Sequence, residues 1–298
     1  MIRSLIVMIV ALTAVACSHT ENTPDEAPDN TPGVSVQALD GPFEFPESAV
    51  WDQARGAWFV SNFGQAFDPT GGTPDAPGYI SRLDADGKIV EARLVESDGD
   101  FLGLAMLDGM LYASRGGELW EIDPDSGQHT VIAVPGAGFL NDVAAGNGAL
   151  YITDTGANAV HRVVPGQEPE IFSQDPALQA PNGIVVDGNA VIVATLGAFP
   201  PNPDSPGGVF VLDDAGDAQQ LGTQTGLFDG IEKLGDEYIV TDITGPLWQI
   251  GADGQALELG NLTELGLGSA NDFGLDAATS TLLVSDLGSS QVWKITIR

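Results

Sequence analysis

The sequence is poor in positive charge and in histidine. Among its 298 residues, Lys and Arg together number 10 against 42 Asp and Glu, with 3 His, so the formal net charge is −32. A nucleic-acid-binding surface needs clustered Lys and Arg to neutralise phosphates, and ten such residues spread through the chain cannot form that patch. The same sign of charge disfavours direct binding to an anionic membrane surface. Nucleic acid is therefore excluded as an expected partner.

The sequence also lacks a hydrophobic run long enough to span a bilayer, which takes about 20 apolar residues. Its apolar run at residues 5–16 has only twelve residues and follows the single charge of Arg3. A short run of this kind, ending in small residues, is typical of a secretory signal. We expect residues 1–16 to be a signal peptide and the protein to be exported.

Cysteine is nearly absent: Cys17 is the only one. The sequence Ala14-Val15-Ala16-Cys17 resembles a bacterial lipoprotein signal, which implies that Cys17 is lipidated. An ordinary signal peptide, cut after Ala16 and leaving a free thiol, is the alternative. A lone thiol in an exported protein favours the lipoprotein interpretation. By analogy with such proteins, Ser18 suggests the outer membrane, facing the periplasm.

Large apolar residues are missing from the segment that follows, SHTENTPDEAPDNTPG at residues 18–33. Such a segment cannot offset its ordering entropy by burial. We therefore expect residues 17–33 to be a lipidated cysteine with a flexible acidic tether, and the lipid to be the chain's only contact with a membrane.

The rest of the chain has what a folded domain needs. Apolar residues make up 43% of the sequence, enough for a sizeable core, and 38 Gly with 19 Pro favour short strands joined by turns over long helices. Six segments repeat one pattern of an opening residue, an apolar strand, a polar turn and a second apolar strand. They begin at Pro46, Phe101, Leu140, Pro181, Phe228 and Ala270.

The spacing of these units predicts the fold. Their second residues are 39 to 55 residues apart, and further β-rich stretches follow each unit. Periods of this length with four short strands each are typical of a β-propeller. We predict an all-β, six-bladed β-propeller with four-stranded blades over residues 34–298, and we expect it to be a monomer. A β-sandwich is the competing architecture.

The end of the chain supports the propeller. The sixth unit holds only three strands, at residues 273–276, 282–285 and 291–297, while a spare strand at residues 34–39 precedes the first unit. A ring of blades needs closure, so we expect this N-terminal strand to complete the last blade. A sandwich would require neither six similar repeats nor a spare strand.

Side-chain oxygens recur where each inner strand begins. In a propeller these positions lie at one mouth of the central channel, and the six residues are Glu47, Leu102, Asn141, Asn182, Asp229 and Asn271. Five oxygen-bearing side chains with two carboxylates would suit one divalent cation, most simply Ca²⁺, with Mg²⁺, Mn²⁺ or Zn²⁺ as alternatives. Asn and Asp are also ordinary turn formers, so the alternative is that these residues only start the strands. This alternative does not account for Glu47, which follows a proline.

These residues also carry a family resemblance. Phe45-Pro46-Glu47 before an apolar strand, Leu140-Asn141-Asp142, Pro181-Asn182-Gly183 and Asp229-Gly230, in this order, resemble the senescence-marker-protein/gluconolactonase/luciferin-regenerating-enzyme-like family of six-bladed propellers. The likeness covers roughly residues 40–298. Diisopropyl fluorophosphatase and the paraoxonases are similar to it more distantly.

The resemblance implies an activity and roles for residues. It implies a metal-dependent hydrolase of the lactonase type, in which Glu47, Asn182 and Asp229 hold the metal and Asp229 acts as general base. Asn141 is implied to contact substrate or metal-bound water, and Asn271 is a further candidate for metal or substrate. Nucleophilic attack by Asp229 itself is the alternative mechanism.

One departure from the family concerns the substrate. Members that act on sugar lactones often carry an Arg two residues before the Asn of the third unit, and this sequence has Phe139 there. A more apolar lactone or ester is therefore expected as substrate. No histidine occupies an opening position, and no Ser-His-Asp arrangement is visible.

Two long, Gly- and Pro-rich connections should lie at the same mouth, at residues 63–77 and 196–207. We expect Phe67 and Phe199 to contact the substrate at the rim, with tolerated surface insertions as the alternative. The Asp residues that end second strands, Asp154, Asp242 and Asp286, are expected to fix turns within blades.

The sequence thus leads to three hypotheses about function. The first is an exported metal-dependent hydrolase of a lactone or related ester. The second is a non-catalytic, calcium-binding propeller that acts as a binding or sensing module. The third is a synthase of the strictosidine-synthase-like kind, which shares the fold but usually lacks the metal ring.

Overall fold

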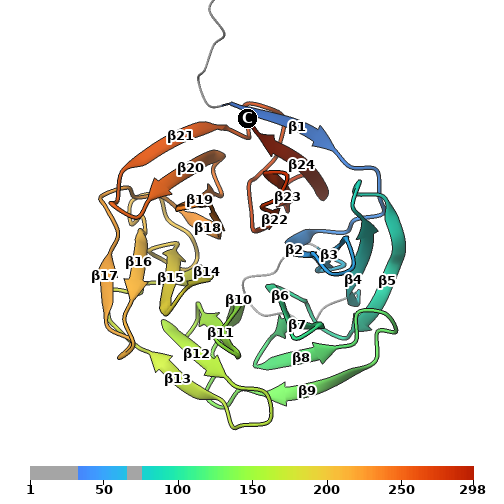
Figure 1. The fold of residues 1–298 in the computed structure, drawn as a ribbon, viewed down its shortest axis with the longest axis horizontal. Helices are drawn as coiled ribbons and strands as arrows, with labels where there is room; N and C mark the ends of the chain where they lie inside the picture. Colours follow the sequence, from blue (N-terminus) through green and yellow to red (C-terminus); the bar gives the residue numbers. More distant parts are fainter. Residues whose placement is uncertain (1–32, 66–75) are drawn as a thin grey trace, which may run out of the picture. The chain divides into compact units, whose positions relative to one another are not determined.

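The computed structural model describes residues 33–65 and 76–298. The predicted signal peptide, Cys17, nearly all of the tether and Phe67 lie outside the described residues. The described residues form strands and turns but no helix, and so contain no apolar helix of the length needed to cross a membrane. Their 24 strands make six separate four-stranded antiparallel sheets, arranged as the blades of a six-bladed β-propeller (Figure 1).

In five blades the four strands run in chain order from the channel outward, and in the last blade the outermost strand comes from the N-terminus. The innermost strands are β2 (Pro46–Asp52), β6 (Leu104–Leu107), β10 (Leu140–Gly146), β14 (Pro181–Asp187), β18 (Phe228–Leu234) and β22 (Phe273–Asp276). The second strands are β3 (Ala57–Asn62), β7 (Met110–Arg115), β11 (Ala149–Asp154), β15 (Ala190–Thr195), β19 (Glu237–Asp242) and β23 (Thr281–Asp286). These two sets hold the six sequence repeats.

The outer half of each blade contains two further strands. The third strands are β4 (Gly78–Asp84), β8 (Glu118–Ile122), β12 (Ala159–Val163), β16 (Val209–Leu212), β20 (Pro246–Gly251) and β24 (Gln291–Ile297). The outermost are β5 (Ile89–Ser97), β9 (His129–Ala133), β13 (Glu170–Ser173), β17 (Ala218–Gln220), β21 (Ala256–Asn261) and, from the N-terminus, β1 (Val34–Ala38).

The N-terminal strand closes the ring, as the sequence predicts. β1 pairs antiparallel with β24, from Val34 opposite Ile297 to Ala38 opposite Trp293. The last blade is therefore built from both ends of the domain, which lie together at the rim (Figure 1). The neighbouring inner strands β22 and β2 are also in contact, so the ring is continuous around the channel.

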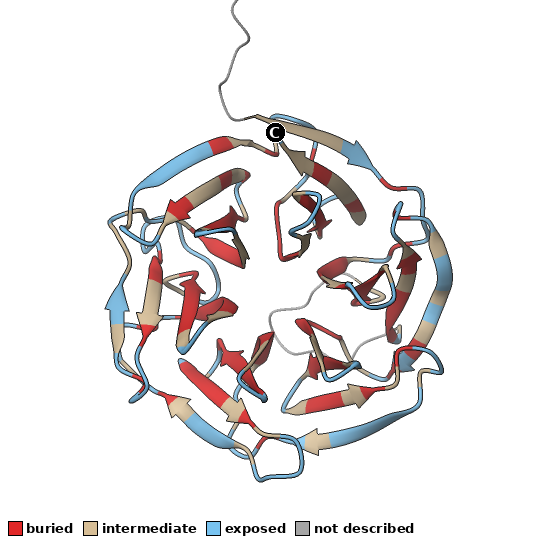
Figure 2. Cartoon of the chain, viewed as in Figure 1, coloured by how far each residue is buried: buried red, intermediate tan, exposed pale blue. Residues whose placement is uncertain are grey.

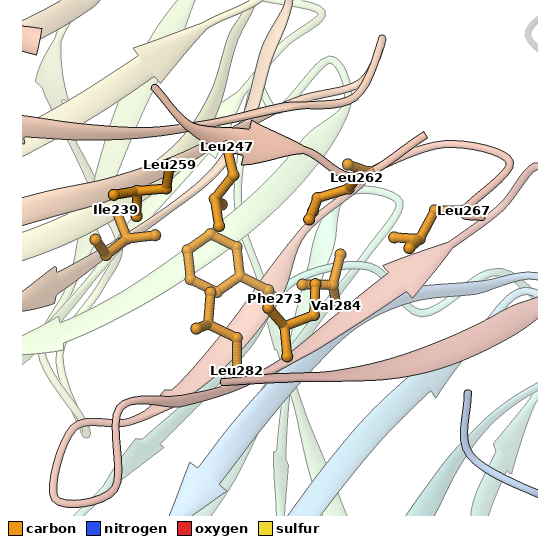
Figure 3. Packing of buried hydrophobic residues seen from close by; sticks show 10 residues of the cluster. Ile239, Leu247, Leu259, Leu262, Leu267, Phe273, Leu282 and Val284 are labelled. Atoms are coloured by element: carbon orange, nitrogen blue, oxygen red, sulfur yellow. The ribbon is translucent and has the colours of Figure 1, made fainter. Parts of the chain in front are cut away.

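The core consists of packing between blades. Six clusters of buried apolar side chains each draw their members from two adjacent blades. In the cluster between the fifth and sixth blades, Phe273 lies among Leu247 and Ile239 on one side and Leu282 on the other (Figure 3). The second strands are covered on both faces, and β11, for example, is buried throughout.

The outermost strands are the most exposed part of the blades. Most residues of β9 and half of those of β13 are exposed, whereas the strands nearer the channel are mostly buried (Figure 2). This gradient explains why the repeat is strongest over the first two strands of each unit: inter-blade packing constrains those residues most.

Candidate functional site

A β-bulge at the start of four inner strands presents their opening residues to the channel. In β14, Pro181 pairs with Thr195 and the next pair is Ile184 with Val193, so one extra residue bulges from the inner strand. The same shift occurs at the start of β2, β10 and β18. A β-bulge leaves residues unpaired and re-aims their side chains. The bulged positions include Glu47, Asn141, Asn182 and Asp229.

The structure brings all six opening residues together. One cavity of about 160 Å³ at the channel mouth, here called the mouth pocket, is lined by Glu47, Leu102, Asn141, Asn182, Asp229 and Asn271. Each of these side chains is at least nine-tenths buried. Five blades therefore supply a buried ring of oxygen-bearing groups, at the place expected from their position in the repeat.

Asp229 is at the centre of the hydrogen bonding in this ring. The Asn182 Nδ2 group donates to Asp229 Oδ1 at 2.5 Å, and the Asn271 Nδ2 group donates to Asp229 Oδ2 at 2.9 Å. Its carboxylate is thus fixed between side chains from the fourth and sixth blades. The Asn141 Nδ2 group is instead directed to Thr155 Oγ1 at 3.1 Å.

Two buried oxygens of the ring have no hydrogen-bond donor among the described residues: Glu47 Oε2 and Asn141 Oδ1. An unpartnered buried oxygen is costly, and in native structures such atoms often mark an ion, a water or a functional role. Both belong to the residue types that hard divalent cations prefer as ligands. Their presence at one cavity fits a cation there.

The negative charges of the ring carboxylates are not balanced by a cationic side chain among the described lining residues. Burial, with the negative charges of Asp229 and Asp272 nearby, raises the pKa of Glu47 well above its usual value. Burial likewise raises the pKa of Asp229 to about 6, against the opposing effect of the amide donors Asn271 and Asn182. Among residues 33–65 and 76–298, those that line the mouth pocket include no Lys, Arg or His. Two acidic groups thus face each other without a cationic side chain.

The carboxylates alone do not form a metal site. Within residues 33–65 and 76–298, no three His, Cys, Asp or Glu side chains gather closely enough to hold an ion. The ring contributes two carboxylates, and its other oxygens belong to amides of Asn141, Asn182 and Asn271. A cation here would need those amide oxygens as ligands, which is common for Ca²⁺ and uncommon for softer metals.

Hydroxyl groups of the second strands connect the ring from blade to blade. Thr153 Oγ1 accepts a hydrogen bond from the bulged Asp142 amide at 2.9 Å and donates to the Asn182 carbonyl of the next blade at 2.6 Å. Thr241 Oγ1 similarly accepts from Gly230 N and donates to the Asn271 carbonyl, both at 2.9 Å. Each hydroxyl accepts a hydrogen bond from the backbone amide of the bulge and positions the ring residue of the next blade.

Glycine after a ring residue allows the inner strands to come close. A Cβ on Gly183 would lie 2.1 Å from the Asp229 carbonyl oxygen, and one on Gly230 would lie 2.6 Å from Asp272 Oδ1. Real Cβ atoms do not approach other atoms so closely, so a larger residue would push neighbouring blades apart. The Asn182-Gly183 and Asp229-Gly230 pairs therefore serve inter-blade packing as well as the site.

Two further buried acids directly follow ring residues in the sequence, and no role was predicted for them. Asp142 follows Asn141, and its Oδ2 atom accepts from Ile184 N of the next blade at 3.0 Å. Asp272 follows Asn271, and burial raises its pKa to about 7. The signal was present as an Asn-Asp doublet at the same place in two units. Asp142 caps backbone amides, so its role includes fold stability.

The rim of the mouth pocket is apolar. Phe139 and Phe199 both line it, and their rings stack with centroids 5.6 Å apart at 21°. Phe63 and Pro201, from the two long connections, also line it, so both connections reach the mouth as the sequence analysis expected. Phe67 is among the residues that the structure does not describe.

The Asp residues that end second strands form hydrogen bonds with the backbone of their own blades. Asp154 accepts hydrogen bonds from Gly138 N and Phe139 N, both at 2.8 Å, and Asp286 and Asp242 make equivalent bonds to Gly268 N and Leu227 N. Each of the three Asp residues also accepts from a backbone amide two or three residues further on, in the turn that follows its strand, which confirms the prediction that they fix turns within blades. His161 is buried against Asp154 and does not line the mouth pocket.

Comparisons with known proteins support the architecture. No family model matches the sequence, and no curated protein matches it. Solved structures do match. A catalytically inactive virginiamycin B lyase from Staphylococcus aureus with quinupristin is 14% identical with a TM-score of 0.59, covering 89% of this chain and 99% of its own.

Two further solved structures are similar over comparable lengths. A streptogramin B lyase is 15% identical with a TM-score of 0.61, covering 89% of this chain and 98% of its own. The PQQ-bound aldose sugar dehydrogenase from Streptomyces coelicolor is 16% identical with a TM-score of 0.62, at the same coverages. At such low identity these likenesses establish the fold alone: the chain is a β-propeller similar in architecture to several propeller enzymes.

Proposed function

We propose that this protein is a metal-dependent hydrolase of an uncharged lactone or related ester, with its active site in the mouth pocket. The observation that carries the proposal is the ring itself. Two buried carboxylates, Glu47 and Asp229, meet three Asn side chains in a cavity without a cationic lining residue. A purely structural channel gains nothing from uncompensated buried acids, because burial of a charge without a partner is unfavourable.

Glu47, Asn182 and Asp229 would hold one divalent cation, with Asn141 and Asn271 as further oxygen donors or contacts to substrate. The donor set fits Ca²⁺ best, because all of its members are hard oxygens. When bound, such a cation supplies a Lewis acid that polarises a carbonyl oxygen and increases the acidity of a neighbouring water.

The chain's own residues account for the proton transfers. Asp229 accepts a proton from the attacking water as the water oxygen bonds to the carbonyl carbon. That proton then passes to the departing alkoxide as the ester carbon–oxygen bond breaks. Asn182 and Asn271 hold the Asp229 carboxylate in place through the two amide hydrogen bonds. Beside a cation the pKa of Asp229 falls, so acidity of the water must compensate for the weaker base.

The apolar rim sets the substrate class within this proposal. Phe139 and Phe199 stand where a charged lactone would need a cationic partner, and the lining residues of the pocket provide none. An uncharged lactone or ester, with its apolar part against these rings, fits the pocket. Attack by the Asp229 carboxylate itself, through an acyl-enzyme, remains the alternative order of events.

The proposal extends to the parts of the chain outside the described residues. Residues 1–16 would direct export and Cys17 would carry the lipid, placing the domain in the periplasm at the outer membrane as a monomer. The absence of a basic patch in the sequence supports a small-molecule substrate over nucleic acid.

Metal content and turnover on one purified sample test the proposal. We expect about one divalent ion per chain by elemental analysis, and hydrolysis of uncharged lactones or aryl esters that chelation abolishes and Ca²⁺ restores. Asp229→Asn should reduce kcat by at least 10³-fold, while Asp236→Asn, in an exposed turn, should not change it. An ion that binds without any turnover would favour the calcium-binding module instead.

A further inference from the structure

A second and larger depression lies beside the mouth pocket. Its volume is about 710 Å³, and its walls are the turn at residues 155–158, the loop at residues 174–180 and the chain at residues 197–199. We call this depression the side groove. It lies between the third and fourth blades and shares one residue, Phe199, with the mouth pocket. Thr155, on its wall, accepts the hydrogen bond from the ring residue Asn141.

The mouth pocket is too small for a sizeable ligand by itself. Its volume of about 160 Å³ equals roughly five water molecules, at about 30 Å³ each. The side groove alone falls in the usual range for ligand pockets, about 300–1,000 Å³. Because the two cavities share Phe199, a ligand whose reacting group enters the mouth pocket has the side groove next to it as space for its remaining part.

The side groove is lined by polar side chains together with small and apolar residues. Gln174, Gln179 and Asn158 contribute amide side chains, and no Lys or Arg of the described residues lines the groove. Its one charged residue, Asp175, already uses both carboxylate oxygens to accept backbone hydrogen bonds, from Ala177 N at 2.8 Å and Ala218 N at 3.0 Å. Amides offer both donors and acceptors, so an uncharged ligand rich in hydroxyl groups matches this surface.

The groove favours a saccharide over an extended peptide. Peptides commonly bind by adding a strand to a free sheet edge. The walls of the side groove consist of turns and loops, and its lining residues belong to no outermost strand. An aromatic ring at the border is present in Phe199, which is 38% exposed. A pyranose ring pairs one apolar C–H face with equatorial hydroxyls, which suits an aromatic ring next to amides.

We propose that the side groove is a binding subsite for a neutral saccharide. Resting on the proposed function, it holds the glycosyl part of an ester or lactone whose carbonyl lies in the mouth pocket. Because no Lys or Arg of the described residues lines either cavity, we expect a neutral sugar to bind more tightly than a sugar acid.

Direct binding tests this inference without relying on turnover. Isothermal titration of the purified full chain with neutral trisaccharides (maltotriose, cellotriose, chitotriose) should give a measurable Kd for at least one of them. Trigalacturonate and acetyl-trialanine amide serve as charged and peptide probes, and we expect each to bind at least tenfold more weakly.

Paired variants locate the site. Gln174→Ala with Gln179→Ala should raise the Kd of the bound trisaccharide at least tenfold, since two amide side chains are lost. Gln219→Ala with Gln220→Ala, which makes the same change on the exposed strand β17, should leave the Kd within twofold. Asp229→Asn should keep saccharide binding, because Asp229 lines the mouth pocket and not the side groove.

The outcomes separate this inference from the proposed function. Groove-dependent saccharide binding without turnover of any lactone or ester would support the subsite and overturn the hydrolase. Hydrolysis of simple esters without binding of any trisaccharide would support the hydrolase and overturn the subsite. Binding that ignores the Gln174 and Gln179 changes, or that prefers the peptide amide, would also overturn it.

Discussion

Phe139 and Phe199 stack their rings across the boundary between two blades, with centroids 5.6 Å apart at an interplanar angle of 21°. Phe139 directly precedes β10 of the third blade, and Phe199 follows β15 of the fourth. Both line the mouth pocket, and Phe199 also borders the side groove. Under the proposed function, this pair would set the polarity of the surface that a substrate meets before it reaches Asp229.

A cation at Phe139 should change substrate preference. We expect Phe139→Arg to raise kcat/KM for an anionic sugar lactone relative to a neutral aryl ester by at least tenfold, because the new guanidinium can pair with the substrate's charge. Steady-state kinetics on both substrates measures the ratio. Phe139→Leu removes the aromatic ring without adding charge, and it should leave the preference for the neutral ester in place. An unchanged ratio for the Arg variant would show that this position does not contact the substrate.

The stabilisation that a bound ion provides should depend on pH. In the ion-free protein, the pKa of Asp229 is about 6 and that of Asp272 about 7, both above their values in an unfolded chain. The folded state therefore retains protons that the unfolded state releases, so stability falls as the pH rises from about 4 to 7. A cation replaces those protons as the compensating charge.

Thermal unfolding with EGTA or with CaCl₂ at pH 5 and pH 8 measures this effect. We expect the Tm increase from Ca²⁺ to be clearly larger at pH 8 than at pH 5, and to disappear in Asp229→Asn. Equal increases at the two pH values would argue that the ion binds away from the ring.

The close approach of inner strands leaves no room for a side chain at Gly183, so a substitution there should destabilise the fold. Gly183→Ala places a Cβ against the Asp229 carbonyl oxygen, only 2.1 Å away, and must displace a neighbouring strand. We expect a loss of about 2–3 kcal/mol in the free energy of unfolding, together with weaker ion binding. Gly117→Ala is the matched control, because its nearest neighbour would be 3.9 Å away. Chemical denaturation of both variants compares them; similar stabilities would mean that the blades readjust without cost.

The Asp154 carboxylate should contribute measurably to stability at neutral pH. Burial opposes its ionisation, but hydrogen bonds from His161 and from three backbone amides more than offset this, and lower its pKa to about 2. Because the folded pKa lies below the unfolded value of 3.8, the contribution is complete above about pH 4 and is lost as the pH falls through about 2. It amounts to about 2 kcal/mol.

Asp154→Asn tests this by denaturation at pH 7, where we expect a loss of about that size, because an amide N–H₂ cannot accept from the backbone. Asp236→Asn removes a carboxylate from an exposed turn and should cost much less. If both variants lose the same amount, general charge effects rather than the hydrogen bonds would be responsible.

Ring closure by the N-terminal strand should also be measurable. A chain that begins at residue 39 loses β1 and exposes the edge of β24, to which Val34, Val36 and their neighbours pair. We expect its Tm to fall by at least 5 °C relative to a chain that begins at residue 33, since Val34 and Val36 also pack against the last blade's core. An unchanged Tm would show that three strands suffice for that blade.

Much of the fold could be predicted from the sequence because each repeat of the sequence corresponds to one blade. Six units with two buried strands each gave the number of blades, and the shortfall of one strand at residues 273–298 predicted the pairing of β1 with β24. The position at the channel mouth could be predicted because each of these residues opens the inner strand of its blade: Glu47, Asn141, Asn182, Asp229 and Asn271. These features depend on local pattern and on the closure of a ring.

Other features could not be predicted, because they depend on contacts between blades. The amide of Asn182 reaches Asp229 over 47 residues of chain, and only the close spacing of inner strands decides which of its atoms faces the carboxylate. The double role of Thr153, which joins its own bulge to the next blade, requires a geometry that no spacing reveals. The side groove similarly arises where loops of two blades meet.

The position of β1 at the outer edge of the last blade also has a mechanical consequence. Any pulling force applied through the N-terminus enters the domain at Val34, opposite Ile297, in the strand farthest from the channel. The hydrogen bonds between β1 and β24 carry that load first, and three further strands separate it from the ring residue Asn271. Strain on this end of the domain would be absorbed at the rim, so the geometry around Asp229 would stay intact until the outermost strand had peeled away.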